Sequence, residues 1–252
     1  MKTKQKTRPI SSDKLKVSVP TSWQEMSDEQ LLYVYRLLGY EVHPDRVMLY
    51  AFMHFAGLHI IRKEQGGHIY IIAKGRAVYP VKEDDLISGA MQLEYIGQPS
   101  TFPVRLSQWK GHPAVNPELR EFPFGHYLQV ENYFQAFLQS ENTQCLREIA
   151  ALLYPGFKGK PDKTLSYNLI SWIYGIKQHF ASEFPDLFQP MPKGGENDWP
   201  DMKAITEAEI RALNGGDITK TDAILAAETW GALAELNAKA KEAAELERIS
   251  KK

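Results

Sequence analysis

The sequence predicts an α+β fold that is predominantly α-helical, with a small β-hairpin in the N-terminal half, a helical second half and a long C-terminal helix. Three observations predict it. β-Branched runs flank a double glycine within residues 58–73, apolar residues recur at helical spacing over residues 124–188, and residues 201–252 are rich in Ala and Glu. The 252-residue chain is 43% hydrophobic and 24% charged, which is ordinary for a folded protein with one large or two small cores.

The charge balance and the cysteine content exclude several classes of protein. Thirty basic residues stand against 31 acidic ones, so no overall field holds a polyanion or an acidic membrane. The single Cys145 cannot form an internal disulfide and fits a reducing compartment. The longest nearly apolar stretch, residues 47–61, is shorter than the roughly 20 residues of a membrane helix, and no apolar signal segment follows the basic start. We therefore expect neither export nor a membrane span.

Shifts in composition divide the chain into segments. We expect a basic disordered arm at residues 1–20, an α+β subdomain with the hairpin at 21–97, a Pro-rich connector at 98–123, a helical subdomain at 124–188, a flexible linker at 189–200 and an Ala/Glu-rich helical tail at 201–252. The aromatic residues Trp109 and Phe122 lie in the connector and need burial, which favours packed subdomains over independent ones.

The first subdomain contains recognisable element boundaries. Ser27 and Gln30 form a capping box that begins a helix ending near residue 39. Pro44 is suited to the first turn of a second helix, which is expected to reach about residue 56. Strands are expected at residues 58–64 and 68–73, and a third short strand at 77–80 stays open. A helix that begins with acidic residues follows them.

The second half is expected to be helical. One strand is considered within the connector, at residues 102–106. Helices are then expected at residues 127–138, 143–154, 163–181 and 202–213, followed by a long final helix that starts near 219–222 and reaches about 249. The helix at 163–181 is apolar around much of its circumference, so it is expected at the centre of this subdomain.

The final helix has a thin apolar stripe of mostly small residues. Such a helix is not stable by propensity alone, so it must lie on the body of the protein or on another chain, and the sequence leaves both alternatives open. The residues expected to bind a partner are Leu225, Trp230, Leu233 and Leu236.

The search for catalytic chemistry gives no candidate. The histidines and Cys145 lack the spacing of metal ligands, and residues 156–161 (GFKGKP) lack the spacing and the hydroxyl of a phosphate-binding loop. Serine and cysteine nucleophile motifs are not found, and the acidic residues at 83–85 are explained by the dipole of the helix that they begin. We therefore expect a non-enzyme with no metal, no cofactor and no small-molecule substrate.

The basic N-terminal arm has two interpretations. Lys2, Lys4, Lys6 and Arg8 are suited to contact phosphates or an acidic partner. The alternative, a solubilising disordered terminus, is favoured because no aromatic residue precedes Trp23.

Several segments resemble a known family. Residues 19–26 (VPTSWQEM), 122–128 (FPFGHYL), 211–220 (RALNGGDITK) and 229–240 (TWGALAELNAKA) are similar to poorly characterised proteins encoded in tailed-phage and prophage gene clusters of gut-type anaerobic bacteria. The similarity spans roughly residues 19–246. The final helix with its Trp and Leu residues looks like those of tail-assembly chaperones.

The resemblance implies a role in forming the phage tail or its assembly intermediates. We expect a non-catalytic structural or assembly protein that contacts other phage tail or assembly proteins, or a second copy of itself, through its C-terminal helices. It implies a location in the cytoplasm of the bacterial host, or in the phage particle. The alternative is a nucleic-acid-associated adaptor that uses the basic arm, although the charge balance disfavours nucleic acid as a partner.

Overall fold

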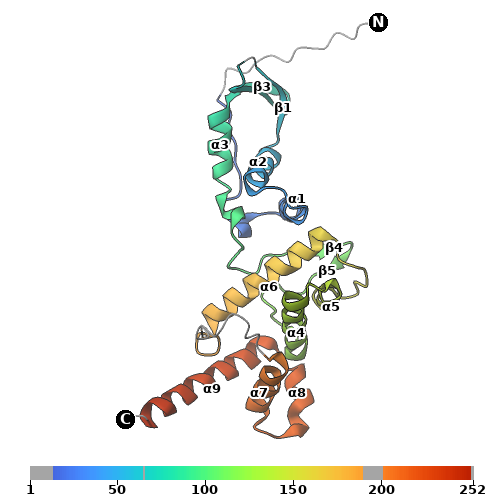
Figure 1. Ribbon diagram of the computed structural model, residues 1–252, viewed down its shortest axis with the longest axis vertical. Helices are drawn as coiled ribbons and strands as arrows, with labels where there is room; N and C mark the ends of the chain where they lie inside the picture. The colour runs from blue at the N-terminus through green and yellow to red at the C-terminus, as the bar shows by residue number, and fades with distance from the viewer. Residues whose placement is uncertain (1–13, 65, 190–200, 251–252) are drawn as a thin grey trace. The chain divides into compact units, whose positions relative to one another are not determined.

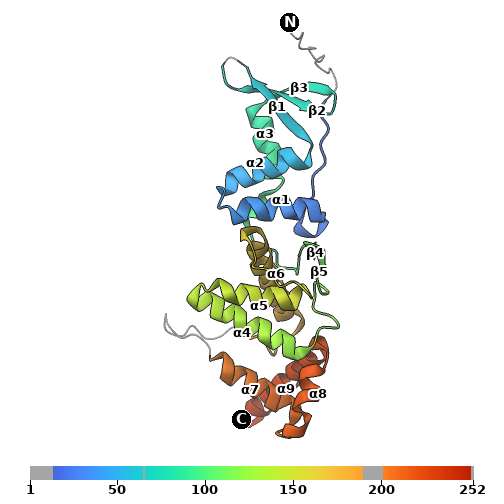
Figure 2. The same cartoon turned by 90° about the vertical axis from the view of Figure 1, so that its right-hand side faces the viewer.

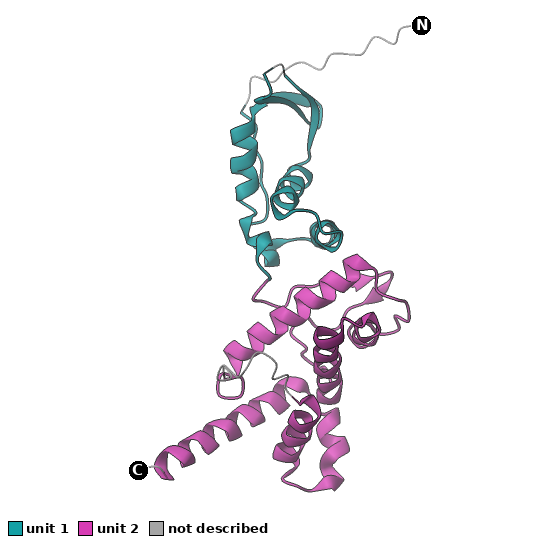
Figure 3. Cartoon of the chain, in the orientation of Figure 1, with its two compact units in different colours: residues 1–99 teal, residues 100–252 magenta. Residues whose placement is uncertain are grey.

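The structure is a computed structural model that describes residues 14–64, 66–189 and 201–250. The chain forms two compact units, Met1–Pro99 and Ser100–Lys252 (Figure 3). The predicted fold class is confirmed, because the structure is mostly helical, has a small antiparallel sheet in the N-terminal half and ends in a long helix (Figure 1).

Unit 1 combines helices with one three-stranded sheet. Its elements are η1 (Trp23–Glu25), α1 (Asp28–Gly39), α2 (Pro44–Phe55), β1 (Leu58–Lys63), β2 (Ile69–Lys74), β3 (Ala77–Lys82), α3 (Glu83–Met91) and η2 (Glu94–Gly97). The helix α2 contacts α1, α3 and β1, so it lies at the centre of the unit (Figure 2). Its core-facing side chains Val47, Ala51 and Phe52 are buried.

The capping box predicted at the start of α1 is confirmed. The Ser27 hydroxyl accepts a hydrogen bond from the Gln30 amide, and the Gln30 side chain accepts one from the Ser27 amide. Met26 and Leu31, on either side of the cap, are both buried. The helix start is thus fixed by local chemistry that the sequence alone contains.

The predicted hairpin is confirmed, and the third strand is present. The strands follow the order β1–β2–β3 and are antiparallel throughout. The register of β1 shifts between Ile60 and Arg62, which leaves Ile61 as a bulge. Pro80 lies in β3, an edge strand, where its missing N–H removes no bond from a sheet ladder.

Unit 2 is built from helices around α6. Its elements are β4 (Gln108–Trp109), β5 (His112–Pro113), α4 (Phe124–Ser140), α5 (Thr143–Leu153), α6 (Lys163–Glu183), α7 (Met202–Asn214), η3 (Ile218–Lys220), α8 (Thr221–Ala226) and α9 (Thr229–Ser250). Side chains along α6, from Leu165 to Phe180, are buried, and Trp172 is the largest side chain that is fully buried.

A buried polar network ties the start of unit 2 to α6. The Asn168 side chain accepts a hydrogen bond from the Leu106 amide at 3.0 Å and donates one to the Tyr154 hydroxyl at 2.8 Å. The Tyr154 hydroxyl in turn donates to the Leu106 carbonyl at 3.1 Å. Because every polar group in this network has a partner, its burial costs little. The network holds the Pro-rich stretch against the helical core, and Trp109 and Phe122 of that stretch are buried.

Two expectations about unit 2 are wrong. The strand considered at residues 102–106 is absent, and the short strands of this region are β4 and β5 instead. The final helix is not continuous from residue 219, because the chain is extended at Ala227 between α8 and α9. There the Phe124 amide donates to the Ala227 carbonyl at 2.8 Å, and the Thr229 amide donates to the Phe122 carbonyl at 2.9 Å. These non-local bonds replace the helical bonds that the sequence favours.

The backbone of Phe102 and Pro103 passes close to α6 at Gly175. A Cβ atom at this position would lie 2.2 Å from the carbonyl oxygen of Phe102. We expect Gly175→Ala to lower the free energy of unfolding by about 2 kcal/mol, because the overlap with rigid backbone outweighs the gain in helix propensity. Urea denaturation measures this change.

The matched control is Gly231→Ala in α9. A Cβ there would meet only Glu228 Oε2, at 3.8 Å. We expect it to leave stability unchanged or to raise it by up to about 1 kcal/mol. Equal losses at the two positions would contradict the steric explanation.

Candidate interaction surface

The structure places the four residues that were expected to bind a partner within unit 2. Leu233 and Leu236 are 0% and 4% exposed, so both are already covered by the protein itself. Leu225 and Trp230 are half-buried. Leu225 packs against the start of α4, with its Cβ 3.2 Å from the place that a Cβ on Gly125 would take. Whether these residues also bind another chain stays a prediction.

Trp230 is the anchor of α9. Its indole N–H donates a hydrogen bond to the Glu118 carbonyl at 2.7 Å, and the Arg120 guanidinium lies over its ring at 4.1 Å. The rings of Phe180 and Phe184 lie 5.5 and 5.4 Å from it, both in edge-on contact. Hydrogen bonding, a cation–π contact and aromatic packing thus hold one side chain from several directions.

Two further contacts hold α9 on either side of Trp230. The Thr229 hydroxyl donates to the Phe122 carbonyl at 2.6 Å in a buried position. Further along, the Asn237 side chain accepts hydrogen bonds from the amides of Asp186 and Leu187 at 2.9 and 3.0 Å, which satisfies backbone groups just beyond α6. The first half of α9 therefore lies on the body of its own chain.

The second half of α9 is different. Every residue from 241 to 250, which we call the distal segment, is exposed. Its two large apolar side chains, Leu246 and Ile249, are each 68% exposed. Figure 1 shows this part of α9 extending away from α7 and α8 toward the C-terminus. None of its side chains is buried by the described part of the chain, and an isolated helix of this length is only marginally stable.

The distal segment carries both charged and apolar side chains. Glu242, Glu245, Leu246 and Ile249 are spaced three or four residues apart and lie on one face of the helix. Lys241 and Arg248 lie four residues before and three residues after Glu245, so they border this face on the side of Glu245. An acidic and apolar face of this kind is suited to a partner with an apolar groove and basic residues at its rim.

Comparisons with known protein families, with curated proteins and with solved structures found no match to this chain.

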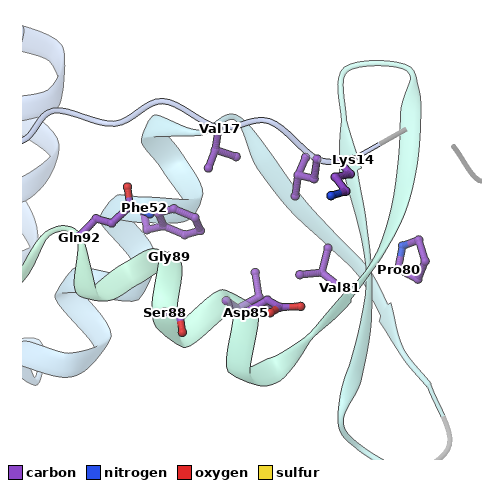
Figure 4. Close-up of a pocket in the computed structure, with 11 residues that line it drawn as sticks. Lys14, Val17, Phe52, Pro80, Val81, Asp85, Ser88, Gly89 and Gln92 are labelled. Atoms are coloured by element: carbon purple, nitrogen blue, oxygen red, sulfur yellow. The ribbon is translucent and has the colours of Figure 1, made fainter. Parts of the chain in front are cut away.

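Two of the hollows formed by the described residues are each lined by a single unit. The first, about 410 Å³, lies in unit 1 between residues 14–17, α2, β3 and α3 (Figure 4). Phe52, Leu86 and Val81 give it an apolar lining, and Lys14 and Asp85 add charge. The second, about 420 Å³, lies beside the start of α4 and is lined in part by Leu225 and His126. Neither brings together a nucleophile and a base in hydrogen-bond contact.

Among the described residues, no three His, Cys, Asp or Glu side chains come together as a metal site would need. Over the same ranges, no helix has the length and apolar character to cross a membrane. Lys2, Lys4, Lys6 and Arg8 lie outside the described residues.

Leu246 and Ile249 are not among the residues that the sequence pattern predicts to bind a partner. The signal was present, since they are the large apolar residues of an otherwise small or charged stretch. They lie on another face of the helix than Leu233 and Leu236, so they do not extend the apolar stripe.

Proposed function

We propose that this chain is a non-catalytic structural or assembly protein of a tailed phage or prophage, chaperone-like in tail assembly, that acts through protein–protein contacts of its C-terminal helices. The resemblance of residues 19–246 supports the phage setting, and the host cytoplasm is then the place of action. Its partners are other phage tail or assembly proteins. The single observation that carries the contact is the exposure of the whole distal segment, residues 241–250.

The two halves of α9 differ in burial, and this difference supports the proposal. The first half of the helix is held on unit 2 by Trp230, Leu233 and Leu236. The distal segment therefore extends from a part of α9 that is packed in place. Burial of Leu246 and Ile249 in a groove would contribute about 3–6 kcal/mol in total. This contribution is a modest part of a stable interface, so the partner must contact further surface of the chain as well.

A photo-crosslinking residue at position 246 tests the contact in cells that produce the phage. We expect an adduct with another tail or assembly protein, identified by mass spectrometry. The control places the same residue at Ile87, which is 54% exposed on α3 of unit 1. No adduct at position 246, or the same adducts at both positions, would contradict the proposal.

A truncation after Ala240 tests the distal segment more directly. It keeps Trp230, Leu233, Leu236 and Asn237, so the shortened protein is expected to keep its melting temperature. Its affinity for the captured partner should fall by at least about a hundredfold, since about 3 kcal/mol or more of apolar burial is lost. Light scattering on both forms shows in addition whether the partner is a second copy. Unchanged affinity would show that the contact lies elsewhere.

A further inference from the structure

Two turns of unit 2 lie side by side near the start of α6 (Figure 1). The first joins β4 to β5 at residues 110–111, and the second, residues 154–162, joins α5 to α6. His112 connects them. Its Nδ1 atom lies 3.3 Å from the carbonyl oxygen of Pro155, and its ring centre lies 5.8 Å from that of Phe157. The side chains of both turns therefore share one region of the surface of unit 2.

This region carries four lysines and a single carboxyl group. The lysines, which we call the basic patch, are all exposed: Lys110, Lys158, Lys160 and Lys163. Asp162 is the one acidic residue of the two turns, and its carboxylate accepts a hydrogen bond from the Leu165 amide at 2.9 Å as the cap of α6. Lys158 and Lys160 form no ion pair with any residue that the structure describes. Positive charge is thus concentrated here, although the charges of the whole chain nearly cancel.

The aromatic rings of the two turns are buried. Trp109 and Phe157 are 9% and 5% exposed, and the Lys110 ammonium lies 5.8 Å from the centre of the Trp109 ring. Contacts between proteins are anchored by large aromatic or apolar side chains and are poor in lysine. Single-stranded nucleic acid needs exposed rings on which its bases stack. The basic patch presents ammonium groups without such an anchor, which fits neither kind of partner.

We propose that the basic patch binds the phosphate backbone of a nucleic-acid duplex. A duplex carries one negative charge for about every 1.7 Å of its axis, so several ammonium groups of one surface can meet phosphates together. Each contact releases counterions from the phosphates and reads no base. Residues 156–161 lack the spacing of a nucleotide-binding loop, but side-chain contacts to a backbone do not require that loop.

Fluorescence anisotropy of the full-length protein with a labelled DNA duplex tests the proposal, over roughly 50 to 200 mM salt. The slope of log affinity against log salt shrinks by about 0.9 for each phosphate contact that is lost. We expect Lys158→Gln combined with Lys160→Gln to reduce the slope by about 1.8 and the affinity in about 100 mM salt by at least about tenfold. The loss should be the same for duplexes of unrelated sequence.

Two further pairs of substitutions serve as controls. Lys203→Gln combined with Lys220→Gln removes the same charge from α7 and η3, where both lysines pair with carboxylates. This pair should leave the slope unchanged. Lys158→Arg combined with Lys160→Arg keeps the charge of the basic patch and should keep the binding.

The proposal is overturned if no duplex binds in about 50 mM salt, or if Lys158→Gln with Lys160→Gln leaves the slope unchanged. Equal losses in the two glutamine pairs would overturn it as well, because binding would then follow the net charge. Tighter binding of a single strand than of the duplex would exclude the duplex as the partner. Binding of polyglutamate but not of DNA, lost in the same variant, would assign the basic patch to an acidic protein instead.

Discussion

Replacing Leu233 with Asp is expected to unfold unit 2 or to cost it more than about 4 kcal/mol. Leu233 is fully buried in α9, so a carboxylate there would be removed from water. The loss is comparable to the whole stability of many domains, which is about 5–15 kcal/mol. Urea denaturation at pH 7, followed by circular dichroism, measures it.

The control is the same substitution at Leu246, in the distal segment of the same helix. This residue belongs to the same helix but is 68% exposed, so Leu246→Asp is expected to change stability by no more than about 0.5 kcal/mol. It should nevertheless weaken binding of the proposed partner. If Leu233→Asp left the stability unchanged, the first half of α9 would not pack on its own unit, and Leu233 would be available to another chain after all.

Replacing Lys177 with Met is expected to destabilise unit 2 by about 3–5 kcal/mol at pH 7. The substitution keeps most of the side chain's length and apolar stem, but it leaves the carboxylate of Glu131, which is 7% exposed, without its countercharge. A lone buried charge is far more costly than a paired one. Thermal and chemical denaturation both measure the loss.

Two comparisons separate this effect from a loss of packing. Lys203→Met, on α7, removes an exposed partner of Glu207 at 3.9 Å and is expected to change stability by less than about 1 kcal/mol. Adding Glu131→Gln to Lys177→Met should restore part of the loss, because the uncompensated charge is gone. A double variant that is less stable than Lys177→Met would contradict the explanation by charge.

Much of the fold could be predicted from the sequence, because the signals are local. The capping box at Ser27 and Gln30 satisfies groups within one turn, and the hairpin around Gly66 and Gly67 joins neighbouring strands. The strand considered at residues 102–106 failed for the opposite reason. The amide of Leu106 bonds to Asn168, which lies 62 residues away and which no window around Leu106 contains.

The candidate surface could be predicted only in part. Periodicity pointed to Leu233 and Leu236 and to their need for burial, but the same stripe serves equally to bind the chain's own body or a separate partner. Burial in the structure assigns these two residues to the body and leaves Leu246 and Ile249 exposed. The Glu131–Lys177 ion pair was not foreseeable, because its members come from α4 and α6 and no spacing in the sequence relates them.

By itself, the sequence determined the fold class, the local helix starts, the hairpin and the need of the last helix for a surface. Each of these follows from capping, turn chemistry or periodicity within a few residues. Only the tertiary structure decided where α9 begins, which part of it is covered and which charges meet. Bonds from Phe122 and Phe124 to the chain around Ala227 outcompete helical bonds there, and such non-local contacts exist only once the unit has folded.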